Sequence, residues 1–167
     1  MTINDIVEKV KETILRDGKH IPMFLVEGAK DGNVILLQDL PGRDTLERVS
    51  SMRNYGTEMA CKCPVGQLQK VFMVHQAWAS KFKGDKIPTL RAASQDPQRQ
   101  EVLIIVELDV LTSKQQSVAF ELVRDKAGQL TLMQPFMETE DGNMFQTETV
   151  YSPLLPAFVE GYSIIDM

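Results

Sequence analysis

Hydrophobic and polar residues recur with two different periods along the chain, and this pattern predicts both helices and strands. Apolar residues spaced three and four apart predict an amphipathic helix over 3–17, which a capping box at Thr2 begins and Gly18 ends. A weaker helical pattern predicts a second helix over 43–61, in which Gly56 is an unfavourable residue.

Short apolar runs bounded by turn residues predict the strands. The clearest run is 102–106, where five consecutive branched aliphatic residues follow a polar loop that contains Pro97. The rest of the chain is predicted as a hairpin over 22–38, a strand over 70–78, a long loop over 79–100, antiparallel strands over 101–151 and an apolar tail over 152–167.

These elements together predict a single α+β domain over 1–167. The successive hairpin signals indicate a mainly antiparallel sheet of about six or seven strands. Two amphipathic helices need such a sheet to bury their apolar stripes. The expected architecture is therefore two-layer, with both helices packed on the sheet.

Composition and charge narrow the class of protein. Hydrophobic residues make up 43% of the chain and charged residues 25%, as in ordinary globular proteins, and the longest apolar run of five residues is far too short to cross a membrane.

The net charge of −5 is uneven, since 81–100 carry +3 and 101–167 carry −8. A mostly acidic surface repels phosphate backbones, so binding to nucleic acid is not expected. Two cysteines form no disulfide framework, which favours the cytoplasm.

The two cysteines, Cys61 and Cys63, with His75 are the only candidate metal ligands of note. Structural zinc usually takes four ligands and a Cys-x₂₋₄-Cys spacing, whereas here one residue separates the thiols and there is no second pair. Ordinary thiols at a helix end explain them better, so neither a metal nor a cofactor is expected.

Catalytic motifs are equally scarce. The chain has no nucleophile elbow and no glycine-rich phosphate loop, so a histidine-based site would need His20 or His75. His20 is interpreted as a turn residue and His75 as a half-buried strand residue. Glu107 and Asp109 share one strand face and offer a carboxylate pair, but a strand end that emerges into solvent explains them equally well.

One group of residues around the long loop is a candidate ligand site. Trp78 ends the strand before this loop, and Asp96, Arg99 and Glu101 lead into the strand after it. In the simpler interpretation Asp96 and Arg99 form a polar clamp that holds the loop to the strand, and Trp78 seals the sheet edge. In the alternative, Trp78 caps a site in which Arg99 holds an anionic group and Glu101 or Asp96 supplies proton chemistry.

Three short motifs resemble a recurring group of small, uncharacterised prokaryotic proteins. They are Asp17-Gly18-x-x-x-Pro22 after the first helix, Ala77-Trp78 at a strand end, and Ser94-x-Asp96-Pro97-x-Arg99-x-Glu101 before a hydrophobic strand. The resemblance covers the first two thirds of the chain and implies a shared fold without a particular chemistry. In that group an acidic residue often precedes Ala-Trp, whereas this chain has Gln76 at that position. The resemblance therefore implies no catalytic acid at this position.

The sequence therefore supports two hypotheses about function. The first is a non-catalytic protein that binds an unknown protein partner or itself, in keeping with the few candidate nucleophiles and with nine methionines. On this hypothesis an uncovered apolar tail, 154–159, would drive dimerisation. The second is an enzyme or small-ligand-binding protein with its site near Trp78 and Asp96-Arg99-Glu101. A weaker third possibility is an accessory protein, encoded in a phage or an operon, that works only in a complex.

Overall fold

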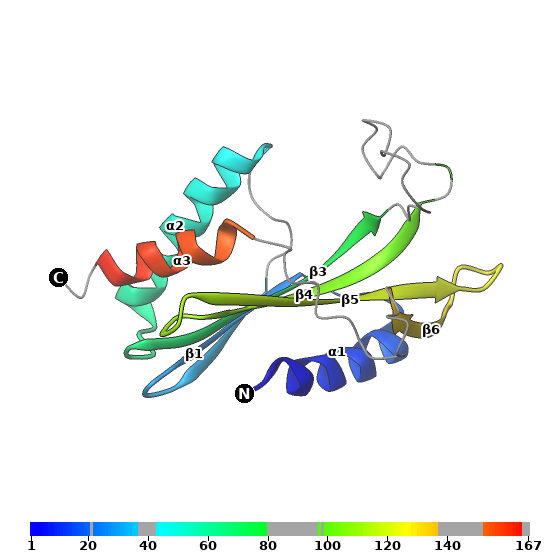
Figure 1. Ribbon diagram of the computed structural model, residues 1–167, viewed down its shortest axis with the longest axis horizontal. Coiled ribbons are helices and arrows are strands. Elements are labelled where there is room, and N and C mark those ends of the chain that lie inside the picture. Colours follow the sequence, from blue (N-terminus) through cyan, green and yellow to red (C-terminus); the bar gives the residue numbers. More distant parts are fainter. Residues whose placement is uncertain (21, 37–42, 80–96, 98, 137–151, 165–167) are drawn as a thin grey trace.

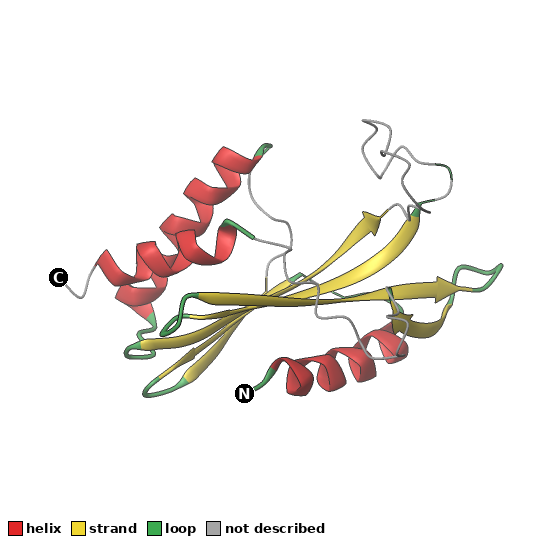
Figure 2. Ribbon diagram, in the orientation of Figure 1, coloured by secondary structure: helices red, strands yellow, loops and turns green. Residues whose placement is uncertain are grey.

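The computed structural model describes residues 1–20, 22–36, 43–79, 97, 99–136 and 152–164. Three helices and six strands lie in these residues (Figure 2). In chain order they are α1 (Ile3–Asp17), β1 (Met23–Gly28), β2 (Gly32–Leu36), α2 (Thr45–Lys62), β3 (Leu68–Ala79), β4 (Gln100–Asp109), β5 (Lys114–Arg124), β6 (Leu130–Pro135) and α3 (Leu154–Ser163).

The six strands form one antiparallel sheet in the order β2-β1-β3-β4-β5-β6. β3 and β4 are at its centre and pair without interruption from Lys70 opposite Asp109 to Ala79 opposite Gln100. The long central strands cross the whole molecule, so their two ends lie far apart (Figure 1).

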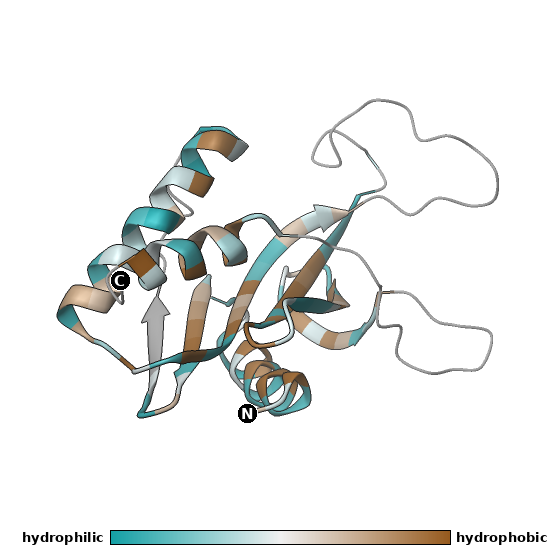
Figure 3. Ribbon diagram, turned by 60° about the vertical axis from the view of Figure 1, so that its left-hand side comes forward, coloured by the Kyte–Doolittle hydropathy of each residue, from teal (hydrophilic) through white to brown (hydrophobic). Residues whose placement is uncertain are grey.

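Helix α1 covers one face of the sheet. Its capping box is present, since the Thr2 side chain accepts from the Asp5 backbone N–H and the Asp5 carboxylate accepts from the Thr2 backbone N–H. Gly18 ends the helix in the left-handed conformation, with φ 73°. The buried side of the helix packs on strand residues that point to one face of the sheet, among them Phe72, Leu103, Ile105, Val118 and Phe120. Figure 3 shows hydrophobic and hydrophilic bands alternating around α1 and along the strands.

Helices α2 and α3 cover the opposite face, at the end of the sheet near the β4–β5 hairpin (Figure 1). They cross in close contact at two glycines. A Cβ atom on Gly161 would lie 1.9 Å from the Arg53 carbonyl oxygen, and one on Gly56 would lie 2.1 Å from the Phe158 carbonyl oxygen. Gly56, which weakens the helix locally, is therefore required by the packing between the helices.

This arrangement confirms the α+β class and the antiparallel sheet but corrects the two-layer prediction. Helices lie on both faces of the sheet, because the central strands are apolar on both sides. In β3, Val71 and Met73 face α2 and α3, whereas Phe72 and Val74 face α1. The predicted pair of helices is corrected to three.

The third helix replaces the predicted apolar tail. Leu155 and Phe158 of α3 are fully buried against α2 and the sheet, and the Phe158 ring lies 4.9 Å from the ring of Phe24. The Tyr162 hydroxyl accepts from the Val65 backbone N–H at 2.8 Å. The predicted dimerisation required this segment to be uncovered. Its apolar side chains are instead buried within their own chain, so this reason for dimerisation is removed.

Other element predictions agree with the structure within a few residues, namely the first helix, the first hairpin, the second helix and the central strands. The predicted strand within 144–151 and most of the loop over 79–100 lie outside the described residues. Among the described residues, none of the three helices has the length and hydrophobicity that a membrane-spanning helix requires.

Candidate functional site

Trp78 and Glu101 lie directly opposite each other on β3 and β4, at the end of the sheet that leads into the long loop. Both side chains are on the face of the sheet that α1 covers, but they lie beyond the residues that pack against the helix. The Trp78 side chain is 47% exposed, and the Arg99 guanidinium lies over its ring at 4.6 Å from the centroid. This distance is that of a cation–π contact.

The Glu101 carboxylate is held by an arginine from the next strand. Nε and Nη2 of Arg124 donate to its two oxygens at 2.6 and 2.8 Å, and Nη1 donates to the Gly128 carbonyl at 3.2 Å. The hydrogen bonds to Glu101 raise the pKa of the Arg124 guanidinium. The pair is only 20–27% exposed, so solvent screens it less than it would a surface pair.

Gln76 connects this ion pair to the end of α1. Its amide nitrogen donates to Glu101 Oε1 at 2.8 Å, and its amide oxygen accepts from the backbone N–H of His20 at 3.2 Å. His20 is buried and follows the helix stop at Gly18. The resulting network, His20–Gln76–Glu101–Arg124, joins the segment after α1 to three neighbouring strands, and we call it the polar clamp.

The structure brings together three of the four predicted site residues. Trp78, Arg99 and Glu101 are neighbours, whereas Asp96 lies outside the described residues. The predicted contact between Arg99 and Asp96 therefore lies outside the described residues. The polar clamp that the structure describes is centred on Glu101.

Gln76 and Arg124 take part in the site but were not predicted to do so. Arg124 is 23 positions from Glu101 in the sequence, and only the register of β4 and β5, with Val102 opposite Glu121, brings them together. The one signal in the sequence was Gln76 itself, a polar residue next to Ala77-Trp78 in a strand with an apolar centre.

The carboxylates Glu107 and Asp109 have separate structural roles. Glu107 is only 4% exposed, and Nζ of Lys70 lies 3.2 Å from its Oε1. The interpretation as a strand end emerging into solvent is therefore wrong for Glu107. Asp109 accepts a hydrogen bond from the backbone N–H of Thr112, and this bond lowers the pKa of Asp109. Each carboxylate is engaged by a different partner rather than directed at a shared point.

The remaining candidate ligands also lie apart. Cys61 and Cys63 are free and exposed at the end of α2, and within the described ranges no three His, Cys, Asp or Glu residues gather as a metal site would require. His75 is half-buried in β3, as predicted, and burial lowers its pKa below the ordinary value of 6.5.

The chemistry of the site follows from which groups are already bonded. The Glu101 carboxylate accepts three hydrogen bonds, two from Arg124 and one from Gln76, and is suited to positioning its neighbours. The Trp78 ring is 47% exposed, and with the Arg99 guanidinium over it the site offers an aromatic surface with a cation on it. Comparisons with family models, with curated proteins and with solved structures gave no match.

Proposed function

We propose that the protein is a non-catalytic binding domain that uses Trp78 and Arg99 to hold an acidic segment of a partner protein. The observation that carries the proposal is the exposed Trp78 ring with the Arg99 guanidinium over it, on strands fixed by the polar clamp. Tryptophan and arginine are the residue types most enriched among those that dominate the energy of protein interfaces.

Charge supports an acidic partner. Residues 81–100, which connect Trp78 to the strand of Glu101, carry five basic and two acidic side chains, whereas 1–80 are neutral in sum and 101–167 carry −8. A guanidinium is planar, and the geometry of its N–H donors suits carboxylates. The net negative charge of 101–167 would repel an acidic partner elsewhere and favour its binding near the basic segment.

The rigid support of Trp78 also favours binding. A side chain that is held in place before the partner arrives loses less conformational entropy on association. The Glu101–Arg124 pair fixes the backbone directly opposite Trp78, and Gln76 fixes the position two residues before it. Both oxygens of Glu101 accept hydrogen bonds, so we assign this carboxylate the role of supporting Trp78 and not that of donating a proton.

The single tryptophan provides the test. Fluorescence of Trp78 is followed while poly-glutamate is added to the purified protein, with poly-lysine and single-stranded DNA as comparison polymers. We expect a saturable change with poly-glutamate alone and its loss in Arg99→Ala. No response to poly-glutamate, an equal response in Arg99→Ala, or a stronger response to DNA would overturn the proposal.

A further inference from the structure

The last part of β3 has an edge that no described strand covers. β3 runs to Ala79, but β1 pairs with it only as far as Val74, which lies opposite Met23. Figure 1 shows the end of β3 projecting beyond the start of β1. On its other side, β3 stays paired with β4 up to Ala79. Within the described residues, the stretch 75–79 therefore has one paired edge and one unpaired edge.

The hydrogen-bond pattern shows which main-chain groups lie on the unpaired edge. In an antiparallel pair, alternate residues direct both their N–H and their C=O to the same neighbouring strand. The Gln69 carbonyl accepts from the Val110 N–H at 2.9 Å, so Gln69 faces β4. The pairing continues without a shift of register through Ala77, which therefore also faces β4, whereas Trp78 faces the unpaired edge. The residue with the exposed ring thus also presents its main-chain donor and acceptor at this edge.

Such an edge is complementary to one conformation of a partner. Main-chain groups at strand spacing are satisfied by another extended chain, which adds to the sheet as a further strand. The segment after α1 reaches only the side chain of Gln76, through the backbone N–H of His20. No described residue bonds to the Trp78 main chain from this side. A short free edge is ordinary in itself, but this one coincides with the Trp78–Arg99 site.

The side chains around the edge specify the sequence of the added strand. Such a strand directs its side chains alternately to the two faces of the sheet. On one face they would lie beside the Trp78 ring and the Arg99 guanidinium over it. On the other face they would meet Ala77 and His75, whose imidazole is neutral at pH 7.5 because burial lowers its pKa below 6.5. Charge complementarity with Arg99 and with the net +3 of 81–100 therefore requires acidic residues only at alternate positions.

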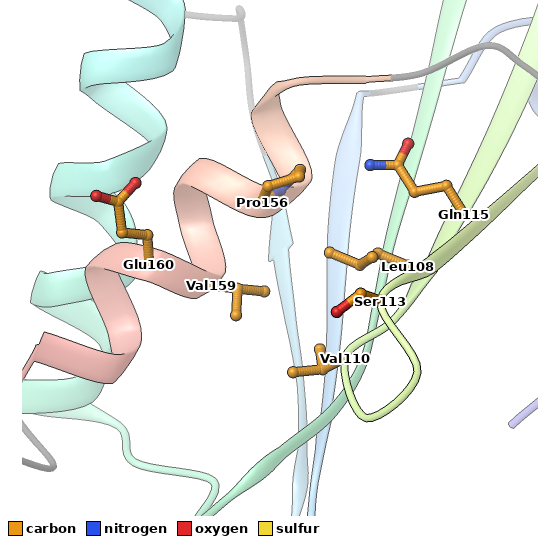
Figure 4. A pocket seen from close by; sticks show the side chains of 7 residues that line it. All are labelled: Leu108, Val110, Ser113, Gln115, Pro156, Val159 and Glu160. Carbon is orange, nitrogen blue, oxygen red and sulfur yellow. The ribbon is translucent and has the colours of Figure 1, made fainter.

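A groove of about 410 Å³ between α3 and the β4–β5 hairpin fits an acidic segment less well (Figure 4). Its mainly apolar walls include Val110 and Val159, and Glu160 is the charged residue among them. The groove therefore offers no cation to an acidic chain. It lies at the opposite end of β4 from Glu101, about 26 Å away at a rise of about 3.3 Å per residue, so the two surfaces can be distinguished by experiment.

We propose that the acidic segment of the partner binds as an added β-strand on the unpaired edge of β3, opposite Trp78, with acidic residues at alternate positions. This mode of binding rests on the proposed recognition by Trp78 and Arg99 and specifies the conformation and the sequence pattern of the partner. Hydrogen bonds to the Trp78 main chain would supply affinity, and the Trp78 ring with Arg99 would select the acidic side chains.

Hydrogen exchange at single amides tests this on the full chain. The probe is a capped peptide, (Glu-Thr)4, added to isotope-labelled protein and followed by NMR. In the free protein the Trp78 amide should exchange faster than the Ala77 amide, which faces β4. With saturating peptide, exchange at Trp78 should slow several-fold, whereas exchange at Ala77, the matched control in the same strand, should change much less.

N-methylation of the peptide gives a second readout. One derivative carries N-methyl groups on its glutamates and the other carries them on its threonines, so both keep every charge. In an added strand only alternate N–H groups face β3, in either strand direction. With the glutamates held on the Trp78 face, one derivative should therefore lose binding and the other should keep it. A contact made by charge and stacking alone would respond equally to both derivatives.

The outcomes separate this inference from the proposed function. Binding of (Glu-Thr)4 without slower exchange at Trp78, or an equal effect of the two N-methyl derivatives, would overturn the added strand and leave the recognition by Trp78 and Arg99 in place. Binding of poly-glutamate but not of (Glu-Thr)4 would do the same. Changes confined to groove residues such as Val110 and Val159 would place the peptide at the other end of the sheet and contradict both. Absence of binding by either acidic chain would also overturn both.

Discussion

Glu101 accepts hydrogen bonds from Arg124 through both of its carboxylate oxygens, at 2.6 and 2.8 Å, across the pairing of β4 and β5. This ion pair is the centre of the polar clamp, and its glutamate lies directly opposite the exposed Trp78. The same end of the sheet therefore combines a rigid base with an outward-facing aromatic and cationic surface. At the other end of the sheet, α2 and α3 cross in close contact at Gly56 and Gly161.

Replacing Glu101 with glutamine should destabilise the protein. The change leaves the Arg124 guanidinium without a carboxylate in a site only 20–27% exposed, and we expect a loss of about 1–3 kcal/mol in the free energy of unfolding. Urea denaturation measures it. The matched control is Arg16→Gln, which removes an exposed pair with Asp17 and should change stability little. Equal stability of Glu101→Gln and wild type would show that the clamp does not hold the sheet.

Gly161→Ala should damage the contact between α2 and α3. The new methyl group would lie 1.9 Å from the Arg53 carbonyl oxygen, so one helix must shift, with an expected cost of about 1–3 kcal/mol or more. Thermal melting of the variant is compared with that of Gly32→Ala, whose methyl group would meet its nearest atom at an ordinary 3.5 Å. A smaller effect of Gly161→Ala than of Gly32→Ala would contradict the close crossing.

Stability should fall as the solution becomes acidic, in part through His75. Burial lowers the pKa of His75 below 6.5, so the unfolded chain takes up a proton more readily than the folded one. The contribution is fully present above pH 6.5, and it is lost as pH falls from there to the lowered folded pKa. His75→Leu should therefore reduce the difference in unfolding free energy between about pH 7.5 and pH 5.5. An unchanged difference in His75→Leu would exclude this histidine as a source of the acid sensitivity.

Much of the fold is predictable from local patterns. The capping box at Thr2 and the stop at Gly18 define α1 within one residue, because both depend only on neighbouring residues. Helix α3 is harder to predict, since Pro153 and Pro156 interrupt its pattern. Both prolines lie before or within the first turn, where backbone N–H groups have no partner within the helix, so they cost no hydrogen bond.

The layers and the candidate site depend on relations that local patterns do not contain. The apolar run Val71–Val74 has two buried faces, but the second helix layer is recognisable only once α3 is placed. Trp78, Arg99 and Glu101 are predictable as neighbours because one long loop separates their strands. Arg124 reaches the site only because of the register in which β4 and β5 pair. A shift of that register by one residue would have directed its side chain to the other face of the sheet.

We propose that Arg124 supports the structure whereas Arg99 serves recognition, and the melting temperatures of Arg99→Ala and Arg124→Ala distinguish these two roles. Arg99 is exposed, so the loss of its contacts, the cation–π contact with Trp78 among them, should cost about 1 kcal/mol or less. Loss of Arg124 leaves Glu101 partly buried without its partner and should cost about 2–3 kcal/mol. We therefore predict that Arg124→Ala melts several degrees below Arg99→Ala, which stays close to wild type. If Arg99→Ala melts as low as Arg124→Ala, then Arg99 is itself a structural clamp and the proposed recognition surface is contradicted.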